Sequence, residues 1–331
     1  MEIFMEKKTR NILIGAGAAI TASAIAGGMV YSATNDLVKV ALDREIPKRM
    51  KRTNVNISGE DNDDEFTQKI NQSTEVLRNS DLETIEIRSF DGEKLTAHWY
   101  SCKNAKRIII AMHGWRSFWA KDFGGISKFL HSNECSVLYA EQRGQNNSGG
   151  EYMGVGLIER YDCFEWIKWL NQKFGEDTSI YLAGVSMGAT TVLMTAGLEL
   201  PSNVCGIIGD CGFTNPYEIW KYVADNNLHM SYAMKGNIAD ILCRKKIQMS
   251  LKDYSCIDAM KKCKVPVLFI HGTDDKFVPI EMTYENYKAC TAPKRLLVVP
   301  GATHAMSYWT ETDKYEDELK RFWADCDKKI E

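Results

Sequence analysis

The chain lacks the cysteine and histidine patterns that form metal and redox sites. Its ten cysteines make no C-x-x-C pair and its six histidines form no cluster, so neither a zinc centre nor a thiol redox motif is expected. It also has no Gly-rich phosphate loop and no internal repeat. A net charge of −3 gives no long-range attraction for nucleic acid. We therefore expect no metal, no cofactor and no nucleic-acid partner.

The composition of the chain fits one large α/β domain. Its 331 residues are 44% hydrophobic, which is enough to bury a sizeable core. Short apolar runs typical of buried strands alternate with helical patterns along most of the chain. This alternation predicts a mostly parallel, doubly wound sheet with helices on its faces.

The most informative segment is Gly184-Val185-Ser186-Met187-Gly188. An apolar, β-rich run precedes it at 179–183, and a helical run without a breaker follows at 189–196. A strand that turns into a helix within one residue strains that residue and exposes its side chain. Small residues are then needed on both sides to avoid a collision. The context favours a nucleophile elbow over a tight structural turn, and it predicts Ser186 as the catalytic nucleophile.

A serine hydroxyl needs a base that takes its proton, and in enzymes this base is normally a histidine. His304 follows the strand-like run 295–299 after a short loop. This position is the carboxyl end of the last strand, where open α/β sheets bind their ligands. We therefore predict His304 as the base, with a simple loop or capping histidine as the alternative.

A carboxylate should hold the imidazole in its working orientation. The buried strand predicted at 265–270 runs into a loop that contains Asp274 and Asp275. Asp210 ends the strand predicted at 204–209 and competes for the same role. We favour the later loop, because it comes directly before the strand that carries the histidine.

Three further motifs accompany the elbow: His113-Gly114-Trp115, His271-Gly272-Thr273-Asp274-Asp275, and Gly301-Ala302-Thr303-His304. Together they resemble the α/β-hydrolase superfamily, and within it the bacterial serine hydrolases of the cinnamoyl-esterase, lysophospholipase and serine-aminopeptidase-like group. The chain order serine, aspartate, histidine agrees with this superfamily. The resemblance covers residues 84–329. It implies that Asp275 is the acid and that the backbone amides of Trp115 and Met187 form the oxyanion hole.

One loop departs from the pattern that this resemblance implies. The superfamily often has Asp-x-Arg-Gly-x-Gly-x-Ser after the strand that follows the His-Gly motif at 113–114. At this place the present chain has Glu141-Gln142-Arg143-Gly144-Gln145-Asn146-Asn147-Ser148. The acid is longer and the second glycine is missing. We interpret the loop as a structural brace, so the departure leaves the expected activity unchanged.

The alternation of strands and helices stops in one segment, which we assign to a cap at about 214–262. Residues 216–252 are mostly helical in pattern and rich in large apolar and methionine side chains. In the superfamily that the chain resembles, an insert at this point covers the active site. The apolar character of this segment suits acyl or aromatic groups of a substrate. Simple helix packing would explain the same pattern. The pocket residues that we expect are Trp119, Phe213, Trp220 and Met234.

The amino-terminal part is organised differently. A basic tail at 1–10 is followed by the uncharged 25-residue run 11–35. As a helix this run would span about 37 Å, enough for a hydrocarbon core of roughly 30 Å. We interpret it as a transmembrane anchor at the cell membrane, with a cleaved signal peptide as the alternative. Basic residues flank it on both sides, so its orientation stays open, with a slight preference for the extracytoplasmic face.

The sequence as a whole predicts a membrane-tethered serine hydrolase. A polar linker with a short helix at 36–82 leads into the α/β-hydrolase domain at 83–329, and all four motifs lie in that domain. The anchor is therefore expected to contribute nothing to catalysis. A small-molecule or lipid-like acyl ester is the favoured substrate, because no charged amine-binding cluster accompanies the motifs. A peptidase, an amidase or an acyltransferase would use the same triad, and a non-catalytic binding module is the alternative from another class.

Overall fold

The computed structural model describes residues 27–48, 64–233 and 235–327. Its centre is an eight-stranded sheet with the strand order β1-β2-β4-β3-β5-β6-β7-β8. β2 pairs antiparallel with both β1 and β4, and the other neighbours pair parallel. The strands are β1 (Glu83–Arg88), β2 (Lys94–Tyr100), β3 (Arg107–Met112), β4 (Cys135–Glu141), β5 (Ser179–Val185), β6 (Val204–Asp210), β7 (Val267–Gly272) and β8 (Lys294–Val299). The mostly parallel sheet predicted from the sequence is confirmed.

The burial of the strands follows from their place in the sheet. Every residue of β3, β4 and β7 is buried, because helices cover both faces of the parallel part. Their sequences are accordingly continuous apolar runs. In the edge strand β1, only Ile85 is buried and Ile87 is half-buried, and the residues between and beside them are exposed.

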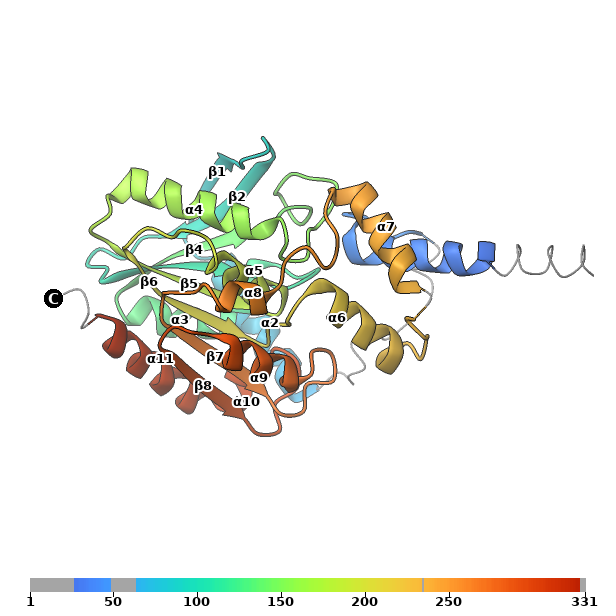
Figure 1. Cartoon of the computed structure of the whole chain (residues 1–331). Coiled ribbons are helices and arrows are strands. Elements are labelled where there is room, and N and C mark those ends of the chain that lie inside the picture. The colour runs from blue at the N-terminus through green and yellow to red at the C-terminus, as the bar shows by residue number, and fades with distance from the viewer. Residues whose placement is uncertain (1–26, 49–63, 234, 328–331) are drawn as a thin grey trace, which may run out of the picture.

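Two layers of helices cover the sheet (Figure 1). One layer packs on the face that includes Ile109, and the other packs on the face that includes Ile108 and Ile110. The first layer contains α2 (Asp64–Arg78), α3 (Trp119–Ser132) and α11 (Thr312–Asp327). The second contains α4 (Glu159–Phe174), α5 (Met187–Thr195), α8 (Cys256–Met260) and α9 (Ile280–Ala289). The short helix α10 (Ser307–Thr310) precedes α11.

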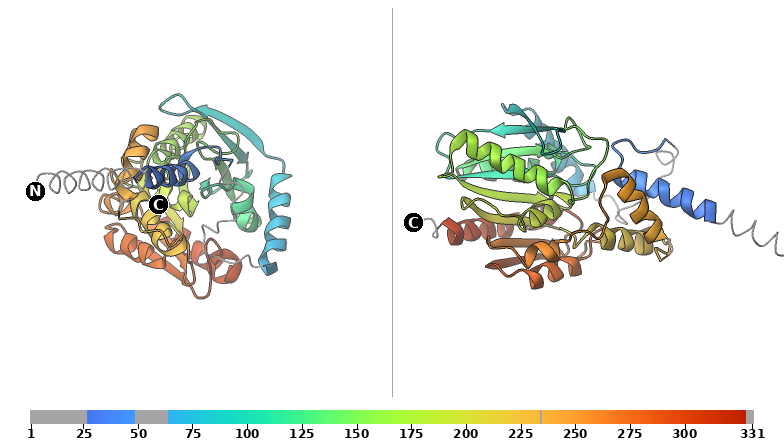
Figure 2. Two further views of the ribbon diagram at one scale, coloured as in Figure 1. Left: turned by 90° about the vertical axis from the view of Figure 1, so that its right-hand side faces the viewer. Right: turned by 45° about the horizontal axis from the view of Figure 1, so that its top comes forward.

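A third group of helices lies at one end of the sheet. It consists of α6 (Pro216–Tyr222), the π-helical turn η2 (Val223–Asn227), α7 (Lys235–Ile247) and a helix at residues 27–42. Figures 1 and 2 show the blue amino-terminal helix beside α6 and α7, beyond the ends of the strands. We call this helix at 27–42 the amino-terminal helix.

The transmembrane helix predicted over 11–35 is wrong. Within the described ranges, no helix combines the length and the apolar character needed to cross a membrane. Residues 1–26, and so most of the uncharged run, lie outside the described residues. The part that is described does not end at residue 35: its helix continues to residue 42, and Val38 and Leu42 are buried against the hydrolase body. The predicted membrane anchor and membrane partner therefore find no support.

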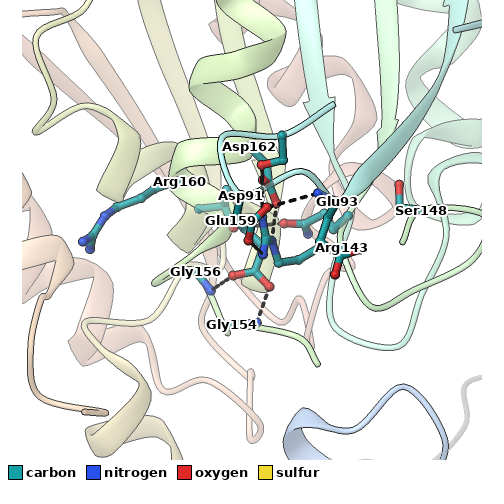
Figure 3. Close-up of polar contacts among 12 residues, drawn as sticks. Asp91, Glu93, Arg143, Ser148, Gly154, Gly156, Glu159, Arg160 and Asp162 are labelled. Atoms are coloured by element: carbon teal, nitrogen blue, oxygen red, sulfur yellow. Dashed lines mark hydrogen bonds and ion pairs between the residues drawn. The ribbon is translucent and has the colours of Figure 1, made fainter. Parts of the chain in front are cut away.

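The loop after β4 connects three parts of the fold through Arg143 (Figure 3). Its guanidinium contacts Asp162 of α4, with Nε 2.5 Å from Oδ2, and Asp91 of the β1–β2 turn, with Nη1 2.7 Å from Oδ2. The Ser148 hydroxyl donates to the carbonyl oxygen of Glu141 at 2.6 Å. Arg143 and Asp162 are both nearly inaccessible to solvent, with side-chain exposures of 5% and 2%. The loop is thus held as a brace between the sheet and α4.

We expect Arg143→Met to lower the free energy of unfolding by about 3–5 kcal/mol, because it leaves the buried Asp162 carboxylate without its cation. Urea unfolding at neutral pH measures this difference. Lys94→Met is the control, because it removes an ion pair between two exposed side chains, Lys94 (39% exposed) and Glu86 (54% exposed). This substitution should lower the free energy of unfolding by less than about 1 kcal/mol. If Arg143→Met lowered the free energy of unfolding no more than Lys94→Met does, the buried ion pair of Arg143 with Asp162 would not stabilise the fold.

Candidate active site

Ser186 occupies the turn between β5 and α5. Its backbone has a φ of 55° and a ψ of −117°, a conformation that L-residues seldom adopt. A methyl group at Gly184 would overlap the backbone of Gly188, and one at Gly188 would overlap the carbonyl of Met112. Both positions therefore require glycine. The strained turn places the Ser186 hydroxyl at the carboxyl end of β5, where it faces the helices beyond the sheet.

Three loops bring Ser186, His304 and Asp275 together. Nε2 of His304 lies 2.9 Å from Oγ of Ser186, and Nδ1 lies 2.7 Å from Oδ2 of Asp275. The loops follow β5, β8 and β7, which end at the same edge of the sheet. In this arrangement Nε2 can accept the serine proton while Nδ1–H donates to the carboxylate.

The Asp275 carboxylate is held by more than the histidine of the triad. Its Oδ1 accepts the backbone N–H groups of Phe277 and Val278 at 2.9 and 2.8 Å, and its Oδ2 lies 3.1 Å from Nε2 of His271. Burial alone would raise the pKa of Asp275. The positive charge of His304 and the hydrogen bonds of both histidines outweigh burial and hold that pKa well below its ordinary value. The group therefore stays ionised.

The surroundings of His304 act in opposite directions on its charge. Burial lowers the pKa of His304. The Asp275 carboxylate raises it by more than burial lowers it, so the pKa lies above its ordinary value. Burial also raises the pKa of the neighbouring Cys211 to about 12, which keeps the thiol neutral. Cys211, Asp275 and His304 offer metal-ligand atoms within 4.8 Å of one another. Both ring nitrogens of His304 are nevertheless engaged with Ser186 and Asp275.

The two competing acids lie elsewhere. Asp274 is exposed, and its Oδ1 accepts the hydroxyl of the preceding Thr273 at 2.7 Å. Asp210 is buried at the end of β6, where its Oδ1 accepts the Ser307 hydroxyl at 3.1 Å. Its backbone carbonyl accepts the N–H of Ser186 at 2.8 Å. Asp210 thus supports the turn of Ser186 through its backbone, while Asp275 contacts the imidazole.

The two predicted oxyanion donors, Trp115 and Met187, lie in the wall around Ser186. Met187 is the first residue of α5, so its amide has no acceptor within the helix. Trp115 lies in the loop after β3, which is fixed by its neighbour Gly114: the N–H of Gly114 donates to Oδ2 of Asp122 at 2.7 Å. Such amides can stabilise an oxyanion.

Comparison with known families identifies the chain. A model of the prolyl oligopeptidase family matches residues 122–329, a segment that contains Ser186, Asp275 and His304. The chain belongs to the prolyl oligopeptidase family. This family member is a serine hydrolase of the ester- or peptide-cleaving kind, and the expected α/β-hydrolase resemblance is confirmed.

The chain is also similar to a further protein over most of its length and to solved structures that share its fold. The family member is 26% identical over 317 residues to YqkD of Bacillus subtilis, an uncharacterized protein, with 95% of this chain and 97% of the relative covered. An esterase of Pyrococcus furiosus has the same fold, with a TM-score of 0.62, 20% identity, and 74% and 91% of the two chains covered. Est1E of Butyrivibrio proteoclasticus, solved with ferulic acid bound, matches with a TM-score of 0.57, 20% identity, and 73% and 98% coverage.

The family member has an apolar pocket beside Ser186, and two of the four predicted pocket residues line it. Phe213 and Trp220 lie in its wall. Trp119 does not, and its prediction is wrong, because the first turn of α3 faces the sheet: the Trp119 ring stacks on His98 with centroids 4.2 Å apart. Met234 lies outside the described residues.

Part of the pocket wall was not predicted from the sequence. Phe277 lines the pocket, and its ring meets the His304 imidazole edge-on with centroids 4.9 Å apart. The amino-terminal helix, part of which was assigned to an anchor with no contribution to catalysis, also lines the pocket. Its contacting residues are Thr34, Leu37, Val38, Val40 and Ala41. The apolar residues over 37–41 were the available signal, but Lys39 interrupts them and Asp36 precedes them, which obscured it.

Proposed function

We propose that the protein hydrolyses a carboxylic ester through an acyl-enzyme. Oγ of Ser186 attacks the carbonyl carbon while Nε2 of His304 takes its proton and then gives it to the departing alcohol oxygen. His304 next takes a proton from a water molecule as that water attacks the acyl carbon, and it returns the proton to Oγ of Ser186 as the Oγ–acyl bond breaks and the carboxylic acid is released. Asp275 holds the imidazole, and the amides of Trp115 and Met187 receive the oxyanion in both steps. The observation that carries this proposal is the 2.9 Å separation of His304 Nε2 and Ser186 Oγ, with Asp275 behind the imidazole.

The chemistry of the pocket supports an ester rather than a peptide. An aminopeptidase binds the free amino terminus of its substrate with a carboxylate, and none of the described residues that line the pocket is Asp or Glu. The wall is instead formed by aliphatic and aromatic side chains, with Lys235 as a charged member. Burial of an apolar chain in such a pocket stabilises the bound ester without a charged partner.

A fluorophosphonate probe together with a substrate panel tests this proposal. We expect covalent labelling at Ser186, located by peptide mass spectrometry, and hydrolysis of p-nitrophenyl esters in preference to aminoacyl p-nitroanilides. Preferential cleavage of the anilides would establish a peptidase instead. Transfer of the acyl group to an added alcohol in preference to water would establish an acyltransferase. Failure of both the labelling and the hydrolysis would leave a non-catalytic binding protein.

A further inference from the structure

The amino-terminal helix presents one continuous side to the pocket. Thr34, Leu37, Val38 and Ala41 lie on one face of a helix, since their positions differ by three, four and seven residues. All four line the same pocket as Ser186. The cap supplies other lining residues, namely Ile219, Trp220, Val223, Ala224 and Leu228.

The end of this helix is attached firmly to the loop that carries a predicted oxyanion donor. The indole Nε1 of Trp115 donates to the carbonyl of Ala41 at 2.9 Å. Nη2 of Arg116 donates to the carbonyls of Val40 and Asp43 at 2.7 and 2.6 Å. The last carbonyls of a helix lack partners within it, so these donors satisfy groups that would otherwise need water.

Further contacts fasten the residues that follow the helix. Oδ1 of Asp43 lies 2.7 Å from Nζ of Lys246 on α7, and Nη1 of Arg44 donates to the carbonyl of Ser148 at 2.6 Å. The helix end is thus connected to the cap and to the loop braced by Arg143. Figure 2 shows this arrangement, with the blue helix lying against the orange helix α7. The amino-terminal helix is therefore part of the folded body.

The helix also gives the pocket a direction. Ala41 is bonded to Trp115 and so lies at the end nearest the oxyanion loop. Thr34 lies seven residues earlier, a distance of about 10 Å along a helix that rises 1.5 Å per residue. Leu37 lies between them. Because all three residues line the pocket, it extends along the helix away from the oxyanion loop.

We propose that the amino-terminal helix sets which ester chain the enzyme accepts. Ala41, Leu37 and Thr34 contact successive parts of an unbranched, uncharged hydrocarbon chain, in this order from the ester group outward. The inference rests on the proposed esterase function and adds a specificity-determining wall to it. The chain can belong to the acyl or to the alcohol part of the ester, since either would be recognised by the same apolar contacts.

Substitutions at the two ends of the wall test this order. We expect Thr34→Phe to reduce kcat/KM most for the longest p-nitrophenyl esters, and Ala41→Phe to reduce it already for short ones. Each methylene excluded from the pocket should cost about fourfold in kcat/KM. Met29→Phe is the matched control, because Met29 is on the same helix but 67% exposed, and it should leave the length profile unchanged.

Leu37→Ala gives a complementary test, because an enlarged pocket cannot fail through overpacking. It should raise kcat/KM for long or bulky esters relative to acetate. The same series is measured with p-nitrophenyl esters of increasing acyl length and with acetates of increasing alcohol length. A change of profile in either series supports the wall and identifies which part of the ester it binds. An unchanged profile in both series overturns the inference.

Labelling separates this inference from the function on which it rests. Every variant is first treated with the fluorophosphonate probe, which reports an intact Ser186 site independently of chain length. Variants that label like the unmodified protein but keep its length profile would overturn the wall and leave the esterase proposal standing. An unmodified protein that neither labels nor hydrolyses esters would overturn both.

Discussion

Ser186→Ala is expected to lower kcat on p-nitrophenyl esters by on the order of 10³-fold or more, because the triad acts as a unit and the remaining groups offer no nucleophile. The fold should persist. The turn at Ser186 is held by Gly184, Gly188 and the backbone hydrogen bond to Asp210, none of which involves the hydroxyl. Steady-state kinetics and urea unfolding of the same preparation measure both effects.

A serine outside the site provides the control for this substitution. Ser132 ends α3, where its hydroxyl donates to the carbonyl of Lys128 at 2.7 Å. Ser132→Ala should keep both kcat and fluorophosphonate labelling. If Ser186→Ala retained a substantial part of the activity, another nucleophile would have to be sought.

Asp275→Asn is expected to lower kcat by on the order of 10³- to 10⁴-fold, as loss of the carboxylate removes the group that orients the base. It should also move the acid limb of the kcat/KM profile. His304 must be neutral to accept a proton, so activity falls as the pH drops through the pKa of His304. Burial lowers that pKa. The Asp275 carboxylate raises it by more than burial lowers it, so the pKa lies above its ordinary value of about 6.5. Asparagine removes the raising charge, so the limb should move to lower pH.

The other acids serve as controls for this shift. Asp274→Asn changes an exposed side chain and should leave both kcat and the acid limb in place. Asp210→Asn alters a buried group that contacts Ser307, so it should affect stability more than the pH profile. A larger loss of kcat in Asp210→Asn than in Asp275→Asn would refute the assignment of the acid.

The contacts among Ser186, His304 and Asp275 could be predicted because each residue follows a strand-like run in the sequence. Ser186 lies where a β-rich run meets a helical run, and His304 follows a strand within a short loop. The choice between Asp275 and Asp210 was harder, since both follow buried strands of the same sheet. What separates them is the direction of the side chain: Asp275 faces His304, whereas Asp210 faces Ser307.

The pocket wall could not be predicted in the same way. The amino-terminal helix contacts residues that are 74 and 76 positions away, Trp115 and Arg116, and its own sequence gives no sign of that contact. An uncharged run rich in small residues matched a membrane span better than a packed helix. Trp119 failed for the opposite reason: it is close to a site motif in sequence, but its helix turns it toward the sheet.

The segment that matches the prolyl oligopeptidase family does not contain the whole candidate active site. The family match begins at residue 122, after Trp115 and well after the amino-terminal helix. A fragment cut at residue 122 would keep Ser186, Asp275 and His304 but lose a proposed oxyanion donor and one side of the pocket. The proposed Ser186, His304 and Asp275 thus lie in a different stretch of the chain from the amino-terminal helix, although Phe213, Trp220 and Phe277 of the pocket wall lie in the same stretch as these three residues. On the proposed function, substitutions at 34–41 would change the ester chain that is accepted and leave Ser186, Asp275 and His304 unaltered.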